Sequence, residues 1–138
     1  MRAAGLLLIA AIACPAAANA QSMNAEVFYK KALALKAKGP MALMSRDLKP
    51  VVSEAKAAGL KARANRLAAS AAGQQPRYCP PKSSKRLGTD EFLNGMAAIP
   101  ATERARIDMT EAMTRILVRK HPCPQLVERA HADKNGRE

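Results

Sequence analysis

The chain has 138 residues, with 23 Lys or Arg against 11 Asp or Glu and a formal net charge of +12. This length allows one small domain and is too short for two. The basic surface favours an acidic partner such as a protein, an anionic lipid, a wall polymer or a nucleic acid. The simpler alternative is a charged surface that only keeps the protein soluble, since the charges are spread along the chain.

The first twenty residues have the three parts of a secretory signal peptide. Arg2 supplies the charged start, residues 6–13 form the apolar run, and residues 18–20 (Ala-Asn-Ala) form the cleavage site. The run is too short for an uncleaved anchor, which needs ~20 apolar residues. A lipoprotein would use Cys14, but the box before it lacks the usual leucine. We therefore predict a signal peptide over residues 1–20, a periplasmic protein, and no transmembrane segment in the mature form.

The mature chain is predicted to begin with a helix. Ser22 or Asn24 can cap it, and Gly39 followed by Pro40 should end it just after Lys38. Its buried stripe is predicted to consist of Phe28, Ala32 and Leu35.

A second helical segment is predicted from Met41 onwards, with a kink or restart at Pro50. A break is expected at Gly59, because the apolar positions change register there. Before the break the apolar face would be formed by Leu48, Val52 and Ala55. After it the face would be formed by Leu60, Ala64, Leu67 and Ala71.

Residues 73–88 are predicted to be a loop, since Gly, Pro and Ser recur through them. Thr89 should cap a short helix whose first turn holds two acids, which favour the helix dipole. This helix would end at Pro100. Its buried side is expected to consist of Phe92, Leu93, Met96 and Ala97.

The strongest helix is predicted from about Thr102 to Lys120, ended by Pro122 and supported by an i,i+4 pair of Glu111 with Arg115. Its wide apolar face indicates a central position in the fold. That face consists of Ile107, Met109, Met113, Ile116 and Leu117. We predict an all-α fold: one helical domain over residues 21–128, a bundle of about four to five helices, followed by a polar tail over residues 129–138.

Two cysteines, Cys79 and Cys123, are left after removal of the signal. A lone cysteine pair in an exported chain favours a disulfide, which would staple the loop to the end of the long helix. A zinc site with His121 and His131 has enough ligands but lacks paired metal-binding spacing. A Cys–His nucleophile is disfavoured because an oxidising compartment removes free thiols.

No catalytic residue, metal ligand or cofactor is expected, because the chain has no G-x-S-x-G, Walker, dinucleotide or H-E-x-x-H motif. Asp90 and Glu91 are adjacent helix residues that point in different directions, which argues against an acid–base pair. Nucleic-acid binding is not expected, since two Phe, two Tyr and no Trp offer too few rings for base stacking.

Exposed bases and a disulfide-braced loop are the expected partner-binding surface. On the helices, the candidates are Lys56, Lys61, Arg63 and Arg66. In the loop, they are Tyr78, Lys82, Lys85 and Arg86.

The second half of the chain carries a recognisable pattern. A Cys79-Pro80-Pro81 turn is followed by a short helix ending in Pro, an amphipathic helix over residues 106–113, and a His121-Pro122-Cys123 end. Over roughly residues 78–124 this resembles the Rap/Tai family of small exported helical proteins. His121 stands where that family often has an aromatic residue, and the first half of the chain shows no such likeness.

The resemblance implies a non-enzymatic periplasmic immunity protein that binds and blocks a secreted peptidoglycan-amidase toxin of a type VI secretion system. The alternative is a general envelope protein with a structural or chaperone-like role and no dedicated toxin. A small hydrolase or metal enzyme is the third possibility, and no catalytic constellation supports it. The partner would be a protein such as a wall hydrolase, and a homodimer stays open.

Overall fold

The structure, a computed structural model, describes residues 22–124. The predicted signal peptide, Cys14, His131 and the tail over residues 129–138 lie outside the described residues. The elements are α1 (Ala25–Ala37), the 3-10 helix η1 (Gly39–Met44), α2 (Leu48–Ala71), α3 (Thr89–Ala97), α4 (Ala101–Arg104) and α5 (Met109–Lys120). The described part of the chain contains no strand, so the predicted all-α class is confirmed. No helix in this part has the length and apolarity to cross a bilayer.

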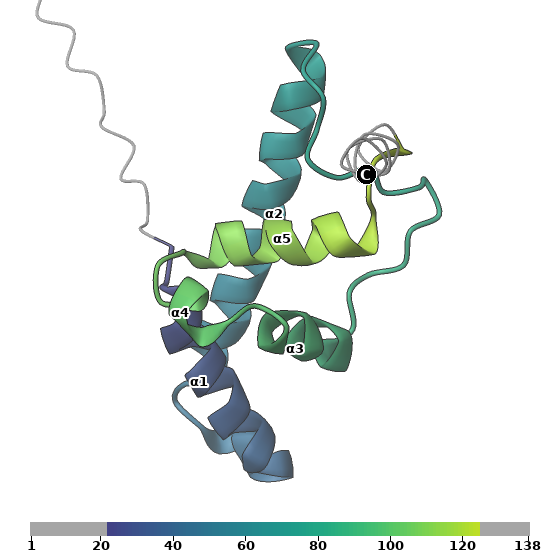
Figure 1. Cartoon of the computed structure of the whole chain (residues 1–138). Helices are drawn as coiled ribbons and strands as arrows, with labels where there is room; N and C mark the ends of the chain where they lie inside the picture. Colours follow the sequence, from purple (N-terminus) through teal and green to yellow (C-terminus); the bar gives the residue numbers. More distant parts are fainter. Residues whose placement is uncertain (1–21, 125–138) are drawn as a thin grey trace, which may run out of the picture.

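The long helix α2 forms the back of the molecule, and α5 crosses it (Figure 1). α1, α3 and α4 pack around one side of this crossing. Met109 and Ile116 of α5 are buried, which confirms the predicted central place of this helix. Met96 of α3 and Met109 and Met113 of α5 are likewise part of the core.

The start and end of α1 follow the predicted capping. The Asn24 side chain accepts hydrogen bonds from the backbone N–H groups of Glu26 and Val27. Gly39 has a φ of 52°, the left-handed conformation that ends a helix at low cost. Phe28 is buried as predicted and meets the Phe92 ring edge-on, with 5.7 Å between ring centroids.

Two predictions for α2 are wrong. The helix runs unbroken through Gly59, where a break was predicted. The predicted restart near Pro50 is confirmed, because η1 ends at Met44 and α2 begins at Leu48. Pro50 lies in the first turn of α2, where its missing N–H costs no hydrogen bond. The predicted apolar face is also wrong at Val52, Leu60 and Leu67, which are all exposed. The buried positions are Val51, Ala58 and Ala62. The small side chains of Ala58 and Ala62 let α5 pack closely on α2, where Met113 Cε lies 4.0 Å from the position that a Cβ of Gly59 would take.

The predicted helix from Thr102 to Lys120 is in fact two helices. Asp108 interrupts it, because its side chain accepts the backbone N–H of Glu111 at 2.8 Å and caps α5. The backbone there also pairs with the segment before α1, through Met109 N–H to Met23 carbonyl at 2.8 Å and Ala25 N–H to Ile107 carbonyl at 3.0 Å. These bonds fix the start of α5 against the start of α1.

At α3, the cap is Gly88 rather than Thr89, which is the first helical residue. Glu91 accepts the Gly88 N–H, and Leu93 and Met96 are buried as predicted. Ala97 is exposed, contrary to prediction.

A disulfide joins Cys79 to Cys123, with 4.9 Å between the two Cα atoms. Beside it, the Cys79 N–H donates to the His121 carbonyl at 2.8 Å. The loop that follows α2 is therefore held against the C-terminal end of α5, as predicted.

Arg104 is a buried cation that no pattern in the sequence identifies. Its Nε donates to the Glu26 carboxylate at 2.6 Å, and its Nη1 donates to the carbonyls of Met96 (2.9 Å) and Ile99. The guanidinium also lies over the Tyr29 ring, 4.2 Å from its centroid. One side chain thus joins α1, the end of α3 and α4.

Candidate functional site

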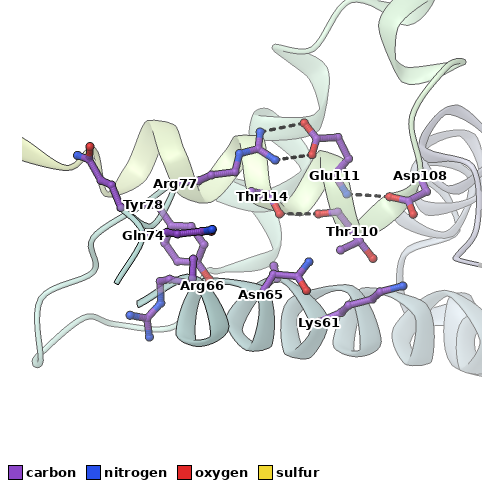
Figure 2. Close-up of a pocket in the computed structure, with 13 residues that line it drawn as sticks. Lys61, Asn65, Arg66, Gln74, Arg77, Tyr78, Asp108, Thr110, Glu111 and Thr114 are labelled. Atoms are coloured by element: carbon purple, nitrogen blue, oxygen red, sulfur yellow. Dashed lines mark hydrogen bonds and ion pairs between the residues drawn. The ribbon is translucent and has the colours of Figure 1, made fainter. Parts of the chain in front are cut away.

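A polar cleft of about 510 Å³ lies between α2 and α5 and is closed on one side by the segment that follows α2. Figure 2 shows its walls, with α2 below and α5 above. The lining polar residues are Lys61, Asn65, Arg66, Gln74, Gln75, Arg77, Tyr78, Asp108, Thr110, Glu111 and Thr114. Three of the predicted partner-binding residues, namely Lys61, Arg66 and Tyr78, come together here.

The α2 wall follows from helical spacing. Lys61, Asn65 and Ala69 are four residues apart and form one row along the helix, and Ala62 and Arg66 form the row beside it. The buried Ala62 brings α5 close. The longer polar side chains at the edge of this contact therefore line the cleft.

The opposite wall is braced by an ion-pair network around Glu111. Arg77 donates two hydrogen bonds to the Glu111 carboxylate, at 2.6 and 3.0 Å. Arg115 adds a third at 2.9 Å, which confirms the predicted i,i+4 pair. The two hydrogen bonds from Arg77, and then the one from Arg115, lower the pKa of Glu111 to about 2. This carboxylate is therefore ionised at neutral pH and locked in place.

Tyr78 differs from the exposed contact residue that was predicted. Its side chain is buried, 4% exposed, because the loop folds it against α2 and the Arg66 guanidinium lies 5.6 Å from its ring centroid. Only the face that Tyr78 turns towards the cleft can contribute to binding. Its main effect is to position Arg66.

Two cations of the cleft have no counter-ion among the residues that the structure describes. Among residues 22–124, neither Lys61 nor Arg66 forms an ion pair, and the Arg66 Nε has no hydrogen-bond partner. Arg77 in contrast is already paired with Glu111. A free ammonium and a free guanidinium in one concave site suit a carboxylate or another anion.

The other predicted contacts lie elsewhere. Lys56 lines a second, apolar groove of about 690 Å³ between α1, α2 and α3. Arg63, Lys82, Lys85 and Arg86 are exposed and line neither hollow. The predicted set therefore divides over several surfaces instead of forming one.

Sequence reasoning missed most of the α5 side of the cleft. Asp108, Thr110 and Glu111 were assigned to the interior of one long helix, and Arg77 was not singled out. The bidentate Arg77–Glu111 contact spans 34 positions of sequence, so no local pattern reveals it. Within residues 22–124, no three His, Cys, Asp or Glu side chains gather as a metal site would require. Asp90 and Glu91 point to different partners, Lys36 and Lys120.

Comparison with protein-family models, with curated proteins and with solved structures found no match to this chain.

Proposed function

We propose that this protein is an exported binding protein without enzymatic activity, an immunity protein that inhibits a secreted peptidoglycan-amidase toxin. In this proposal the cleft between α2 and α5 receives an acidic group on the toxin surface. The resemblance of residues 78–124 to the Rap/Tai family suggests the toxin class, and the cleft suggests the mode of contact.

The observation that carries the proposal is that two cations of the cleft, Lys61 and Arg66, form no ion pair among residues 22–124. They sit on a helix, and the facing wall is held by the Glu111 network. The braced wall keeps the shape of the cleft when a carboxylate enters, and the cations of α2 contribute to the rate of encounter and to specificity.

A matched pair of charge reversals on α2 tests this use of the cleft. Lys61→Glu changes a cleft residue, while Arg63→Glu makes the same change in charge two residues away and outside the cleft. Binding to a wall amidase encoded beside this protein would be measured by calorimetry at two salt concentrations. We expect Lys61→Glu to weaken binding about tenfold to a hundredfold and Arg63→Glu to change it less than about threefold.

Protection of living cells tests the function itself. Cells that export this protein should survive periplasmic delivery of the neighbouring amidase toxin, and cells that export Lys61→Glu should survive poorly. If Lys61→Glu and Arg63→Glu weaken binding equally, the cleft is not the site of contact with the toxin. If no wall hydrolase binds and no cells are protected, the alternative of a general envelope protein takes its place.

A further inference from the structure

The turn between α1 and α2 exposes a cluster of large apolar side chains. Met41, Leu43 and Met44 of η1, here called the apolar tip, are 64%, 79% and 80% exposed. Scattered single apolar residues are ordinary on a protein surface, but three within four positions form a patch that points to a binding partner.

Basic residues flank the apolar tip on both sides in the sequence and are here called the basic collar. The segment over residues 36–49 has four bases, Lys36, Lys38, Arg46 and Lys49, and a single acid, Asp47. Lys36 is paired with Asp90, with 2.8 Å between Nζ and Oδ1, so the outward charge comes from the other three bases. Asp47 is neutralised by Lys31, with 2.8 Å between Nζ and Oδ1. Among the described residues, Arg46 and Lys49 form no ion pair, so their charge is free to act outwards.

Apolar surface continues from the turn into the body of the molecule. The groove of about 690 Å³ begins at Gly39 and Ala42 of η1 and runs past Leu48 and Val52 of α2. In Figure 1 the turn lies at the lower end of the molecule, and the segment after α2 lies at the upper end. A partner at the apolar tip would therefore leave the α2–α5 cleft open.

Charge decides between the two occupants that would cover such a patch. A second copy of this chain would bring two basic collars together, and their repulsion opposes a symmetric contact. An anionic bilayer instead attracts the collar and accepts the Met and Leu side chains at the boundary of headgroups and acyl chains. We propose that the apolar tip and its basic collar dock this protein on the surface of an anionic phospholipid membrane.

Vesicle sedimentation with the purified chain tests the docking. We expect binding to vesicles of phosphatidylglycerol mixed with phosphatidylcholine, and little binding to phosphatidylcholine alone. The variant Met41→Ser/Leu43→Ser/Met44→Ser should reduce binding about tenfold, while Leu60→Ser/Leu67→Ser, which removes exposed leucines further along α2, should leave it unchanged.

The charge requirement has its own matched pair. Arg46→Glu/Lys49→Glu reverses the collar, and Lys82→Glu/Lys85→Glu makes the same change in net charge within the loop after α2. If the protein docks through the tip, Arg46→Glu/Lys49→Glu should weaken vesicle binding about tenfold, and Lys82→Glu/Lys85→Glu should weaken it less than about twofold. Equal losses would show nonspecific attraction of a basic protein and would overturn the proposal.

Insertion can be read directly because the chain contains no Trp. Met44→Trp should shift its fluorescence emission to the blue when anionic vesicles are added, and Leu67→Trp should not. A shift of both probes, or of neither, contradicts docking at the tip. A second copy of the chain would be the occupant if the protein were a dimer by light scattering and did not bind vesicles. In that case the Met41/Leu43/Met44 serine variant would be a monomer, and membrane docking would be contradicted.

Discussion

At the scale of single residues, charged side chains in this protein divide into two kinds. Arg104 and Glu111 are enclosed by partners and hold segments together, whereas Lys61 and Arg66 line a cleft and form no ion pair within residues 22–124. The first kind acts on stability, because loss of one partner leaves the other groups unpaired. The second kind is available for a ligand.

Arg104→Ala should lower the free energy of unfolding by about 2–4 kcal/mol. The change removes the Arg104 donor from the Ile99 carbonyl and from the Glu26 carboxylate, and it removes the cation over Tyr29. Chemical denaturation would measure the loss, with Arg106→Ala as control, since Arg106 is exposed and should matter by less than about 0.5 kcal/mol. Arg104→Lys should retain only part of the stability that Arg104→Ala loses, because an ammonium cannot reproduce the hydrogen-bond geometry of a guanidinium. Equal stability of the two alanine variants would contradict the role of Arg104.

Glu111 makes stability depend on pH. Its pKa is lowered from an ordinary 4.5 to about 2, so its ion pairs stabilise the folded state fully above about pH 5. This contribution is lost as the pH falls from about 4.5 to about 2, because the folded state must then bind a proton that it resists. The carboxylate is partly exposed, so solvent screening limits its share to the order of 1 kcal/mol.

The measurement compares the wild type with Glu111→Gln by denaturation across this range. The difference in stability should be largest near neutral pH and should shrink towards pH 2. Arg77→Gln, which removes the largest cause of the shift, should flatten the dependence in the same way. A difference that stays constant with pH would show that Glu111 acts through packing and not through its charge.

At the scale of helices, close approach is achieved with small residues. α5 packs on α2 at Ala58 and Ala62, and on α3 at Gly95. A Cβ at Gly95 would lie 2.9 Å from Cγ1 and 3.0 Å from Cγ2 of Ile116, whereas a Cβ at Gly59 would meet only Met113 Cε at 4.0 Å. Gly95 therefore has no room for a side chain, whereas Gly59 has room for a methyl group.

Alanine at these two glycines should change stability in opposite directions. Gly59→Ala should stabilise by about 0.5–1 kcal/mol, because alanine favours the helix and the space is open. Gly95→Ala should destabilise by about 1–2 kcal/mol, because the overpacking outweighs the same helical gain. Thermal denaturation would measure both. The cost of Gly95→Ala should disappear when it is combined with Ile116→Ala, and a cost that persists would refute the clash.

At the scale of the whole molecule, α5 is clamped at both ends. Backbone bonds to Met23 and Ala25 hold its start, and the disulfide together with the Cys79 to His121 bond holds its end. Segments far apart in sequence are therefore tied to one central helix. In a small domain, whose core buries a limited share of its surface, such ties supply much of the net stability.

Removal of the disulfide should test the second clamp. Cys79→Ser/Cys123→Ser opens a ring of 44 positions, which in the chain-entropy model costs about 4 kcal/mol. The free energy of unfolding of this variant should equal that of the wild type measured under reducing conditions. Alkylation of both thiols in freshly isolated native protein would refute the bond, as would equal stability with and without reductant.

Local features of the sequence were enough to predict much of the fold. Asn24, Gly39 and the glycine- and proline-rich segment after α2 predicted where helices begin and end, because capping and backbone freedom depend on a few neighbouring residues. The disulfide was equally accessible, since the predicted removal of the signal peptide leaves two cysteines, which have one possible internal pairing. The all-α class followed from helical periodicity alone.

Only the tertiary structure decided which faces are buried and which charges meet. Leu60 was predicted to be a core residue and is exposed. α5 packs instead on the flatter face that contains Ala58 and Ala62. The burial of Arg104 and the cleft beside Glu111 could not be predicted, because both depend on contacts between segments far apart in the sequence. Burial and pairing are properties of two surfaces in contact, and the sequence of one helix does not specify which surface it will meet.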